Sequence, residues 1–175
     1  NYQQHAKTIF QKVITNETIL ELLRKNLNAT NGEKKEIREK LYKIIKDEYS
    51  INKILGMNLL LFCEPNNRVL LRVHQPKKFG DDVTKERFAI KKVNSTHKEL
   101  RGFESGKFNH GFRNVFPIID KDNKVLGCID VGYSSEYLQN TLEEVHKIHT
   151  HFLVSKKISK ERSWGEKYFN SHYSS

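Results

Sequence analysis

The fold is decided by the stretch 68–133, which contains the runs RVLLRVHQPKKFGDDVTKERF (68–88), GFESGKFNHGFRNVFPIID (102–120) and VLGCIDVGYS (125–134). Three strand-like segments of this stretch each carry one charged residue within an apolar alternation: Arg72, Arg113 and Asp130. A charge inside such a strand costs free energy unless it is paired or hydrogen-bonded. Three of them on neighbouring strands indicate a shared polar cavity in the sheet, where a ligand can bind.

The alternation predicts strands at 57–64, 68–74, 100–104, 111–119 and 125–133. In the second strand, Leu70, Arg72 and His74 share one side, and Val69, Leu71 and Val73 share the other. We expect the wholly apolar side to pack on helices. The Arg72 side should face the 75–82 loop and a helix that Thr84 caps and that runs to about Val93. Phe116 should lie on the opposite face from Arg113.

Helical periodicity flanks these strands. One long helix is expected over 2–28 and a second over 33–48, with a turn at Gly32 between them. The apolar stripe from Ile9 to Leu27 is either a dimer seam or a face that packs on its own domain. Ser134 or Ser135 caps a further helix to about 148, followed by a strand at 151–156 and a partly helical tail. The order of elements predicts an α+β domain with a five-stranded antiparallel sheet preceded by a long helix and a second helix.

Composition narrows the functional classes. The formal charge is +10 over 175 residues, but the densest basic group, at 34–40, is interleaved with Glu33, Glu36 and Glu39. This pattern is typical of a solvated helix face rather than a nucleic-acid surface. No apolar run approaches the roughly 20 residues that span a bilayer. Because Asn1 opens inside a helical pattern, we expect the chain to be a piece of a longer protein.

Metal and catalytic motifs are weak in this sequence. Cys63 and Cys128 belong to no metal-ligand spacing, and a disulfide between them requires neighbouring strands in suitable register. The Asp81–Asp82 pair lacks the spacing of a calcium loop and is better explained as a hydrogen-bond acceptor in the loop. The histidines form no recognised ligand set, and no nucleophile occurs beside a base. We expect no enzyme activity, no metal and no cofactor.

The three quoted blocks resemble the sensory Cache domains (double Cache, PAS-like) of bacterial membrane receptors. The resemblance rests on R-x-H-x-P followed by FGDD and Arg87, on GFE-x-G followed by G-x-R-x-V-x-P, and on LG-x-I-D, in that order over about 56–134. Asp130 stands where the family often has Glu. The resemblance implies a PAS-like core at 56–135 after a helical region at 1–55. It also implies a C-terminal helix and extension at 136–175, where a second lobe would start.

The resemblance implies an extracytoplasmic sensor of a chemoreceptor, histidine kinase or diguanylate cyclase. Such a receptor lies in the inner membrane, has flanking transmembrane helices and forms a homodimer. The residues expected to bind its ligand are Arg72, His74, Arg87, Glu104, Arg113 and Asp130. The residues expected to form or support a lid are Phe79, Gly80, Asp81, Asp82 and Phe116. Two other interpretations stay open: an internal ion network without a ligand, and an intracellular basic α+β binding module or small enzyme.

The expected ligand is an anionic or zwitterionic small molecule under a lid formed by 75–87. Three arginines outnumber the two carboxylates Glu104 and Asp130 in the predicted pocket, and arginine binds carboxylates through a planar two-point fork. His74 would add a donor whose charge varies near neutral pH.

Overall fold

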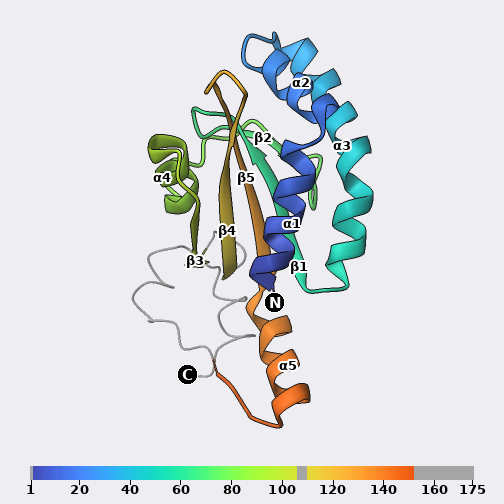
Figure 1. Ribbon diagram of the computed structural model, residues 1–175, viewed down its shortest axis with the longest axis vertical. Coiled ribbons are helices and arrows are strands. Elements are labelled where there is room, and N and C mark those ends of the chain that lie inside the picture. Colours follow the sequence, from blue (N-terminus) through green and yellow to red (C-terminus); the bar gives the residue numbers. More distant parts are fainter. Residues whose placement is uncertain (1, 106–109, 152–175) are drawn as a thin grey trace.

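The computed structural model describes residues 2–105 and 110–151. Five strands form one antiparallel sheet in the order β2-β1-β5-β4-β3 (Figure 1). The strands are β1 (Met57–Cys63), β2 (Val69–Arg72), β3 (Leu100–Ser105), β4 (His110–Ile119) and β5 (Val125–Ser134). The expected α+β class with a five-stranded antiparallel sheet is confirmed. β5, which carries Asp130, occupies the centre of the sheet, and this position removes Asp130 from water.

Helices cover both faces of the sheet. α1 (Tyr2–Ile14), α2 (Glu17–Asn26) and α3 (Asn31–Lys53) lie against one face, and α4 (Phe88–Thr96) lies against the other (Figure 1). α5 (Ser135–His146) follows β5 directly, and Ser134 caps it as expected, with its hydroxyl accepting from the backbone N–H of Tyr137. The strand expected at 151–156 and the tail lie outside the described residues, apart from His151.

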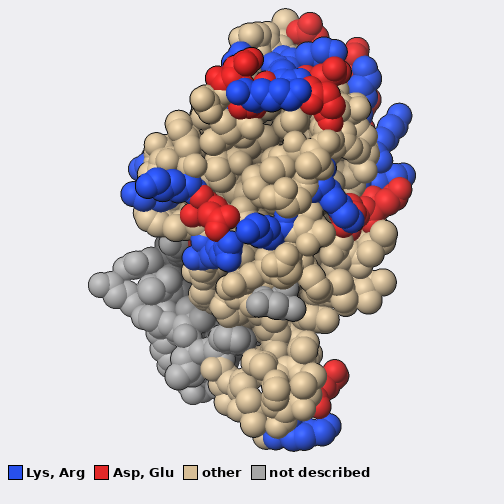
Figure 2. Space-filling model, in the orientation of Figure 1, with Lys and Arg blue, Asp and Glu red and all other residues tan. Residues whose placement is uncertain are grey.

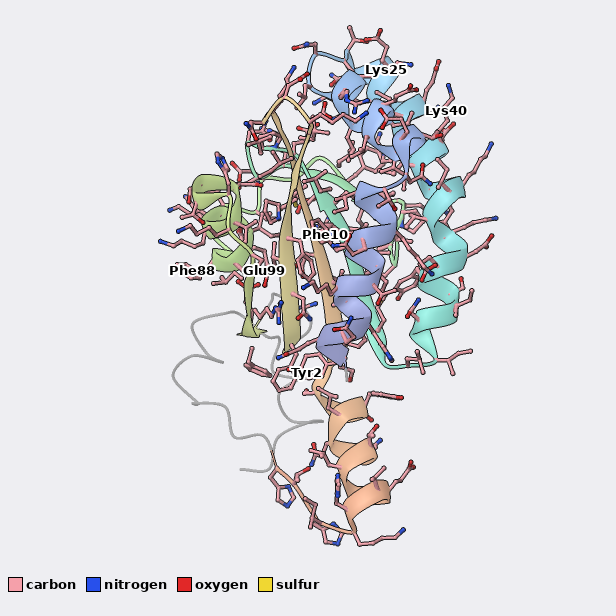
Figure 3. The ribbon with its side chains drawn as sticks, in the orientation of Figure 1. Tyr2, Phe10, Lys25, Lys40, Phe88 and Glu99 are labelled. Carbon is pink, nitrogen blue, oxygen red and sulfur yellow. The ribbon has the colours of Figure 1, made fainter. Side chains whose placement is uncertain are left out.

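The larger apolar core lies between the sheet and α1–α3. Phe62, Leu60 and Tyr133 are fully buried there, and burial of one such side chain stabilises the fold by about 1.5–3 kcal/mol. Phe10 points from α1 toward the sheet and stacks on Phe116 with ring centroids 4.6 Å apart (Figure 3). Phe116 therefore faces the helices, opposite to Arg113, as the strand alternation predicted.

The prediction of one long helix over 2–28 is wrong, because the chain forms two helices that are separated by Thr15 and Asn16. Asn16 is extended, and its side-chain oxygen accepts from the backbone N–H of Ile19, 3.2 Å away. Asn competes with helical backbone bonding and is a good N-cap, so it starts a new helix instead of continuing the first.

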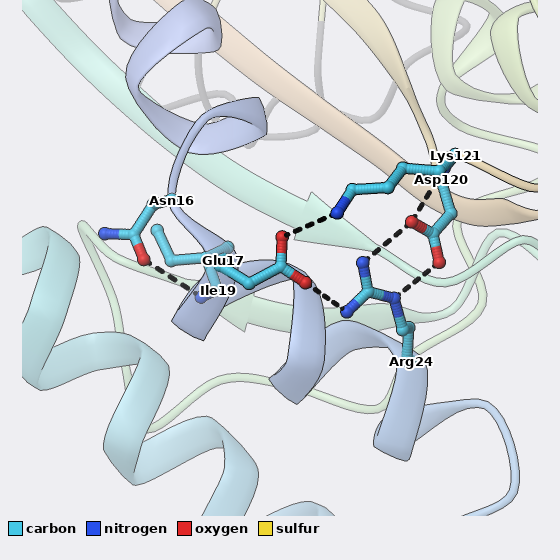
Figure 4. Close-up of polar contacts among 6 residues, drawn as sticks. All are labelled: Asn16, Glu17, Ile19, Arg24, Asp120 and Lys121. Atoms are coloured by element: carbon cyan, nitrogen blue, oxygen red, sulfur yellow. Dashed lines mark hydrogen bonds and ion pairs between the residues drawn. The ribbon is translucent and has the colours of Figure 1, made fainter.

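Arg24 fastens α2 to the turn between β4 and β5. Its guanidinium donates twice to the carboxylate of Asp120, with Nη2 2.7 Å from Oδ1, and once to Glu17 at 2.6 Å (Figure 4). Lys121 lies 3.8 Å from the same Glu17 carboxylate. Hydrogen bonds from Arg24 lower the pKa of Asp120 to about 2. The helical layer is thus tied to the end of the sheet through charged groups as well as apolar contacts.

α3 starts earlier and ends later than expected. Thr30 and Glu33 form a capping box: Glu33 accepts from the Thr30 backbone at 2.7 Å, and the Thr30 hydroxyl accepts from the Glu33 backbone. Gly32 consequently lies inside the first turn of the helix rather than in a separate turn. Upstream, Ile9 and Leu23 are buried in the chain's own core. The stripe therefore packs on its own domain, which is one of the two interpretations expected from the sequence.

Two further boundaries and the faces of two residues also differ from those expected. β2 ends at Arg72, and an irregularity opposite Phe62 and Cys63 interrupts its alternation. Val69 consequently packs on the α4 face, whereas Leu70 joins the core under α1–α3, the reverse of the expected sides. α4 begins at Phe88 rather than after Thr84, because Asp82 accepts from both the backbone and the hydroxyl of Thr84 and holds that segment in a turn.

Acidic and basic side chains lie side by side over α2 and the beginning of α3 on the face that Figure 2 shows. This arrangement agrees with the solvated-helix interpretation of the basic composition. Within 2–105 and 110–151, no helix combines the length and the apolar character needed to cross a bilayer.

We expect Asn16→Ala to lower the free energy of unfolding by about 1 kcal/mol, because α2 loses its N-cap acceptor. Urea denaturation measures the change. Asn16→Asp is the matched control, since its carboxylate can accept the same hydrogen bond and favours a helix N-terminus. An alanine variant as stable as the wild type would contradict the assigned cap.

Candidate ligand-binding site

A cavity of about 540 Å³ opens between the α4 face of the sheet and the 75–87 segment. Its lining is formed by Leu59, Arg72, His74, Gln75, Lys77, Lys78, Phe79, Asp81, Asp82, Val83, Glu86, Arg87 and Arg113. The structure thus brings together four of the six predicted ligand-binding residues. Glu104 and Asp130 stand behind the lining, paired with Arg87. Gly80 and Phe116 are not part of the lining.

Arg87 is the centre of a buried ion cluster. Its Nε donates to Glu104 at 2.7 Å, and its Nη2 donates to Oδ2 of Asp130. The second oxygen of Glu104 accepts from the backbone N–H of Ala89 at 3.0 Å, at the start of α4. Burial lowers the pKa of Arg87, but the charges of Asp130 and Glu104 more than offset this and raise it overall. An internal ion network therefore lies at one wall of the cavity. It contains the expected Glu104 and Asp130, but Arg87 joins them, and the expected Arg72 pairs with Asp81 instead.

Arg113 reaches the cavity from β4 with only 3% of its surface exposed. It is paired in register with Gly132 on β5, and a side chain at that glycine would collide with Nη1 of Arg113. Burial lowers the pKa of Arg113 to about 10, although Asp130 and Glu104 act in the opposite direction. Arg113 is thus a cation in a poorly hydrated place, where an additional negative charge is favourable.

Arg72 is tied to the 75–87 segment rather than to the ion cluster. Its two Nη atoms donate to the two oxygens of Asp81, both at 2.7 Å, and Nη1 also donates to the Lys78 carbonyl at 3.0 Å. The surplus of one arginine counted from the sequence is therefore wrong, because Asp81 supplies a third carboxylate. A loop residue can be assigned as such a partner only when the path of the loop is known.

Further contacts hold the 75–87 segment. The guanidinium of Arg38 on α3 lies 3.5 Å from the ring centroid of Phe79, a cation–π contact. Arg68 donates to the Gly80 carbonyl at 2.8 Å. Hydrogen bonds from Thr84 lower the pKa of Asp82, which agrees with its predicted role as a loop acceptor. Within the described part of the chain, no three metal-ligating side chains gather into a possible ion site.

His74 differs from the expected pH-sensitive donor. Burial lowers its pKa to about 4, and the charges of Arg72 and Arg113 act in the same direction. It is therefore neutral near pH 7, and the expectation of a variable charge there is wrong. Nδ1 lies 3.2 Å from the Leu60 carbonyl, so this nitrogen carries the proton and donates. The other ring nitrogen, Nε2, is then an acceptor.

Sequence reasoning missed several residues of the cavity. Gly132 gives Arg113 its space, and the available signal was a glycine inside a strand, which often marks a close approach. Glu86, Lys77 and Lys78 line the cavity itself, whereas Gly132 stands behind Arg113. No periodicity distinguishes a lining residue in a loop from a solvated one.

Comparison with known proteins places this chain in a family. The family model described as the double sensory domain of two-component sensor kinase matches residues 1–173. The chain belongs to this dCache_3 family. The resemblance to Cache-type sensor domains is confirmed, and the dCache_3 domain is a sensory part of a receptor, not itself its catalytic part. No curated protein matches the sequence closely enough to count as a relative.

Solved sensor domains share the fold of this chain. A domain of a putative sensory box/GGDEF protein from Vibrio parahaemolyticus has a TM-score of 0.55 at 14% identity, covering 82% of this chain and 57% of that one. The extracellular domain of the putative histidine kinase vpHK1S-Z8 has a TM-score of 0.54 at 15% identity, covering 82% of this chain and 54% of that one. The Escherichia coli DcuS sensor domain has a TM-score of 0.51 at 14% identity, covering 79% of this chain and 98% of that one. The chain thus spans little more than half of the first two, and these identities establish the fold alone.

The lowered pKa of His74 predicts a pH dependence of stability. The unfolded chain binds a proton at this residue below about pH 6.5, whereas the folded chain does so only near pH 4. We therefore expect the free energy of unfolding to fall as the pH decreases from 6.5 to 4. His74→Asn, which keeps a donor toward Leu60, should lose less over this range. Denaturant titrations at pH 7, 5.5 and 4.5 measure both proteins, and parallel curves would contradict the assigned shift.

Proposed function

We propose that this chain is the extracytoplasmic ligand-sensing domain of a bacterial transmembrane signalling receptor, which is a chemoreceptor, a histidine kinase or a diguanylate cyclase. Its ligand is a small polar molecule that bears a carboxylate. The observation that carries the proposal is the cavity of about 540 Å³ with three arginine side chains in its lining. This volume lies within the range of small-molecule sites, and membership in a sensory family supports the same function.

The carboxylate is inferred from how deeply the three guanidinium groups of the lining are buried. Arg72 is half-buried, and Arg87 is 8% exposed. Arg113 is the most buried of the three, and burial lowers its pKa despite its acidic neighbours. A ligand carboxylate beside Arg113 would compensate this unfavourable desolvation. Nε2 of neutral His74, on the same cavity, would accept from a hydroxyl or ammonium of the ligand.

Signalling would use the contacts between the lid and α3. Phe79 lies under Arg38, and Tyr49 packs on His74 with ring centroids 6.5 Å apart. A ligand that binds better to one arrangement of the 75–87 segment shifts the population toward it, and these contacts pass the change to α3. The sensor itself performs no chemistry and uses no cofactor in this proposal.

The wider assembly follows the same reasoning. Flanking transmembrane helices outside the given sequence would anchor the domain in the inner membrane, with the sensor on the periplasmic side, and the receptor would act as a homodimer. We keep the division into a helical region at 1–55, a sensor core at 56–135 and an extension at 136–175, at which a second lobe would begin.

The ligand class is tested by a thermal-shift screen of dicarboxylates, amino acids and uncharged amides of similar size. A ligand at about 100 times its Kd should raise the Tm by roughly 5–10 °C. Hits are then titrated calorimetrically against Arg113→Ala and Arg113→Lys. We expect the affinity to fall by about tenfold or more in the alanine variant, because a charged hydrogen bond contributes about 1.5–3 kcal/mol.

Arg101→Ala is the matched control, since Arg101 is an exposed arginine on β3 that pairs with Glu99 and does not line the cavity. Its affinity should equal that of the wild type. Circular dichroism verifies that each variant is folded, and the lysine variant keeps the charge but loses the fork. Hits confined to uncharged compounds, or unchanged affinity in folded Arg113 variants, would overturn the carboxylate proposal.

Gly132→Ala probes the same position without removing a charge. The added methyl group would collide with Nη1 of Arg113 and would lie 3.0 Å from Cβ of Leu59, so the guanidinium must move. We expect weaker binding of the carboxylate hit, by about tenfold, in a protein that still folds. Gly102→Ala is a control with open space around the added methyl group. Equal affinities of the two variants would show that the position of Arg113 is not important for binding.

A further inference from the structure

Cys63 and Cys128 lie directly opposite each other on β1 and β5, two adjacent strands in the interior of the sheet. Both are free thiols and both are buried, with 3% and 1% of their surface exposed. They belong to the apolar cluster on the α4 face, together with Ile90 and Val93. Both side chains therefore point to the same side of the sheet. The sequence left open whether their strands are neighbours in suitable register, and the structure meets that condition.

The backbone geometry suits a covalent bond. Directly opposed residues of antiparallel strands have Cα atoms about 4.5 or 5.5 Å apart, and disulfides span about 4.4–6.8 Å. Two effects raise the pKa of the Cys128 thiol: the larger is a hydrogen bond with Cys63, and the second is burial. Gly127 has a φ of +129°, and a side chain there would collide with the Cys63 carbonyl oxygen. The glycine thus permits the close approach of the two strands at this point.

We propose that Cys63 and Cys128 form an intramolecular disulfide when the chain meets a disulfide oxidant. Its formation in the cell rests on the proposed extracytoplasmic location, because such bonds persist outside the reducing cytosol. One cysteine thiolate attacks the oxidant's disulfide and releases one thiol. The second thiolate then attacks this mixed disulfide and releases the other thiol. The two cysteines lose two electrons, the oxidant gains them, and the two cysteine protons pass to the released thiols.

The bond would act on the wall of the cavity. Asp130 follows Cys128 by two residues on the same strand and pairs in register with Leu61 of β1. A covalent tie between β1 and β5 would fix the strand that carries the acceptor of Arg87. Motions that accompany ligand binding would then be confined to the 75–87 segment and its contacts with α3.

The test follows oxidation in the folded and in the unfolded chain. The full 175-residue chain is equilibrated in glutathione buffers of graded ratio, one series refolded and one kept in concentrated guanidinium chloride. After an acid quench, free thiols are alkylated under denaturing conditions, and the mass of the protein is measured by mass spectrometry. The reduced chain takes up two alkyl groups and the oxidised chain takes up none. We expect the equilibrium constant for the bond to be at least about 100-fold larger in the folded series.

Cys63→Ser and Cys128→Ser are the controls, because each should form only a mixed disulfide with glutathione. The oxidised wild type should melt about 10 °C above its reduced form, whereas reductant should leave the Tm of the serine variants unchanged. The proposal would be overturned if the equilibrium constant for disulfide formation were no larger in the folded series than in denaturant. Disulfides that formed only between chains would also overturn it. Because glutathione supplies the oxidant in vitro, the result is independent of the ligand screen and of the cellular compartment.

Discussion

The charged face of this domain depends on one buried carboxylate, Asp130, at the centre of the sheet. A buried charge that loses its partner costs about 3–5 kcal/mol, so Asp130 requires a cation that reaches it from outside the sheet. Arg87 supplies that cation and, through Glu104, connects the same cluster to β3 and to the first turn of α4. The guanidinium of Arg87 thus fixes the end of the 75–87 segment against the sheet. The cavity exists because this segment is held at both ends, by Arg72 at the strand and by Arg87 at the helix.

The two faces of the sheet differ in composition: one is an apolar core, and the other carries the charged groups and the cavity. The face under α1–α3 is a continuous apolar core, closed at its end by the ion pair of Arg24 and Asp120. The other face has a smaller apolar cluster beside the ion network and the cavity. The 75–87 segment joins these two layers, because Phe79 contacts Arg38 of α3 while Asp81 pairs with Arg72 of β2. In the proposed sensor, a change in this segment would reach the helical layer without disturbing the packed core.

Much of this arrangement is visible in the sequence because charges inside apolar strands stand out. Arg113 and Asp130 were assigned to the polar face, and Phe116 to the other, from alternation alone. The pairing of Arg72 with Asp81 was not predictable, since it depends on the path of a loop. Thr84 was mistaken for a helix cap because two acceptors decide where that helix starts: Asp82 holds Thr84 in a local turn, and Glu104 of β3 accepts from the backbone of Ala89. The break at Asn16 shows the same limit: an apolar stripe continues through a position where the backbone changes direction.

The pairing of Arg72 with Asp81 also changes the argument about the ligand. The three arginines are matched by Asp81, Glu104 and Asp130, so net charge alone does not demand an anion. Location decides instead. The Asp81 side chain is 53% exposed, and an ion pair there is weakened by water, whereas Arg113 is almost completely buried. A ligand carboxylate is attracted most strongly to the guanidinium that water reaches least. The reason is that two opposite charges at a given distance attract more strongly at a lower effective dielectric constant. In the proposed complex the carboxylate therefore lies beside Arg113, and a cationic or hydroxyl group of a zwitterionic ligand lies toward Nε2 of His74.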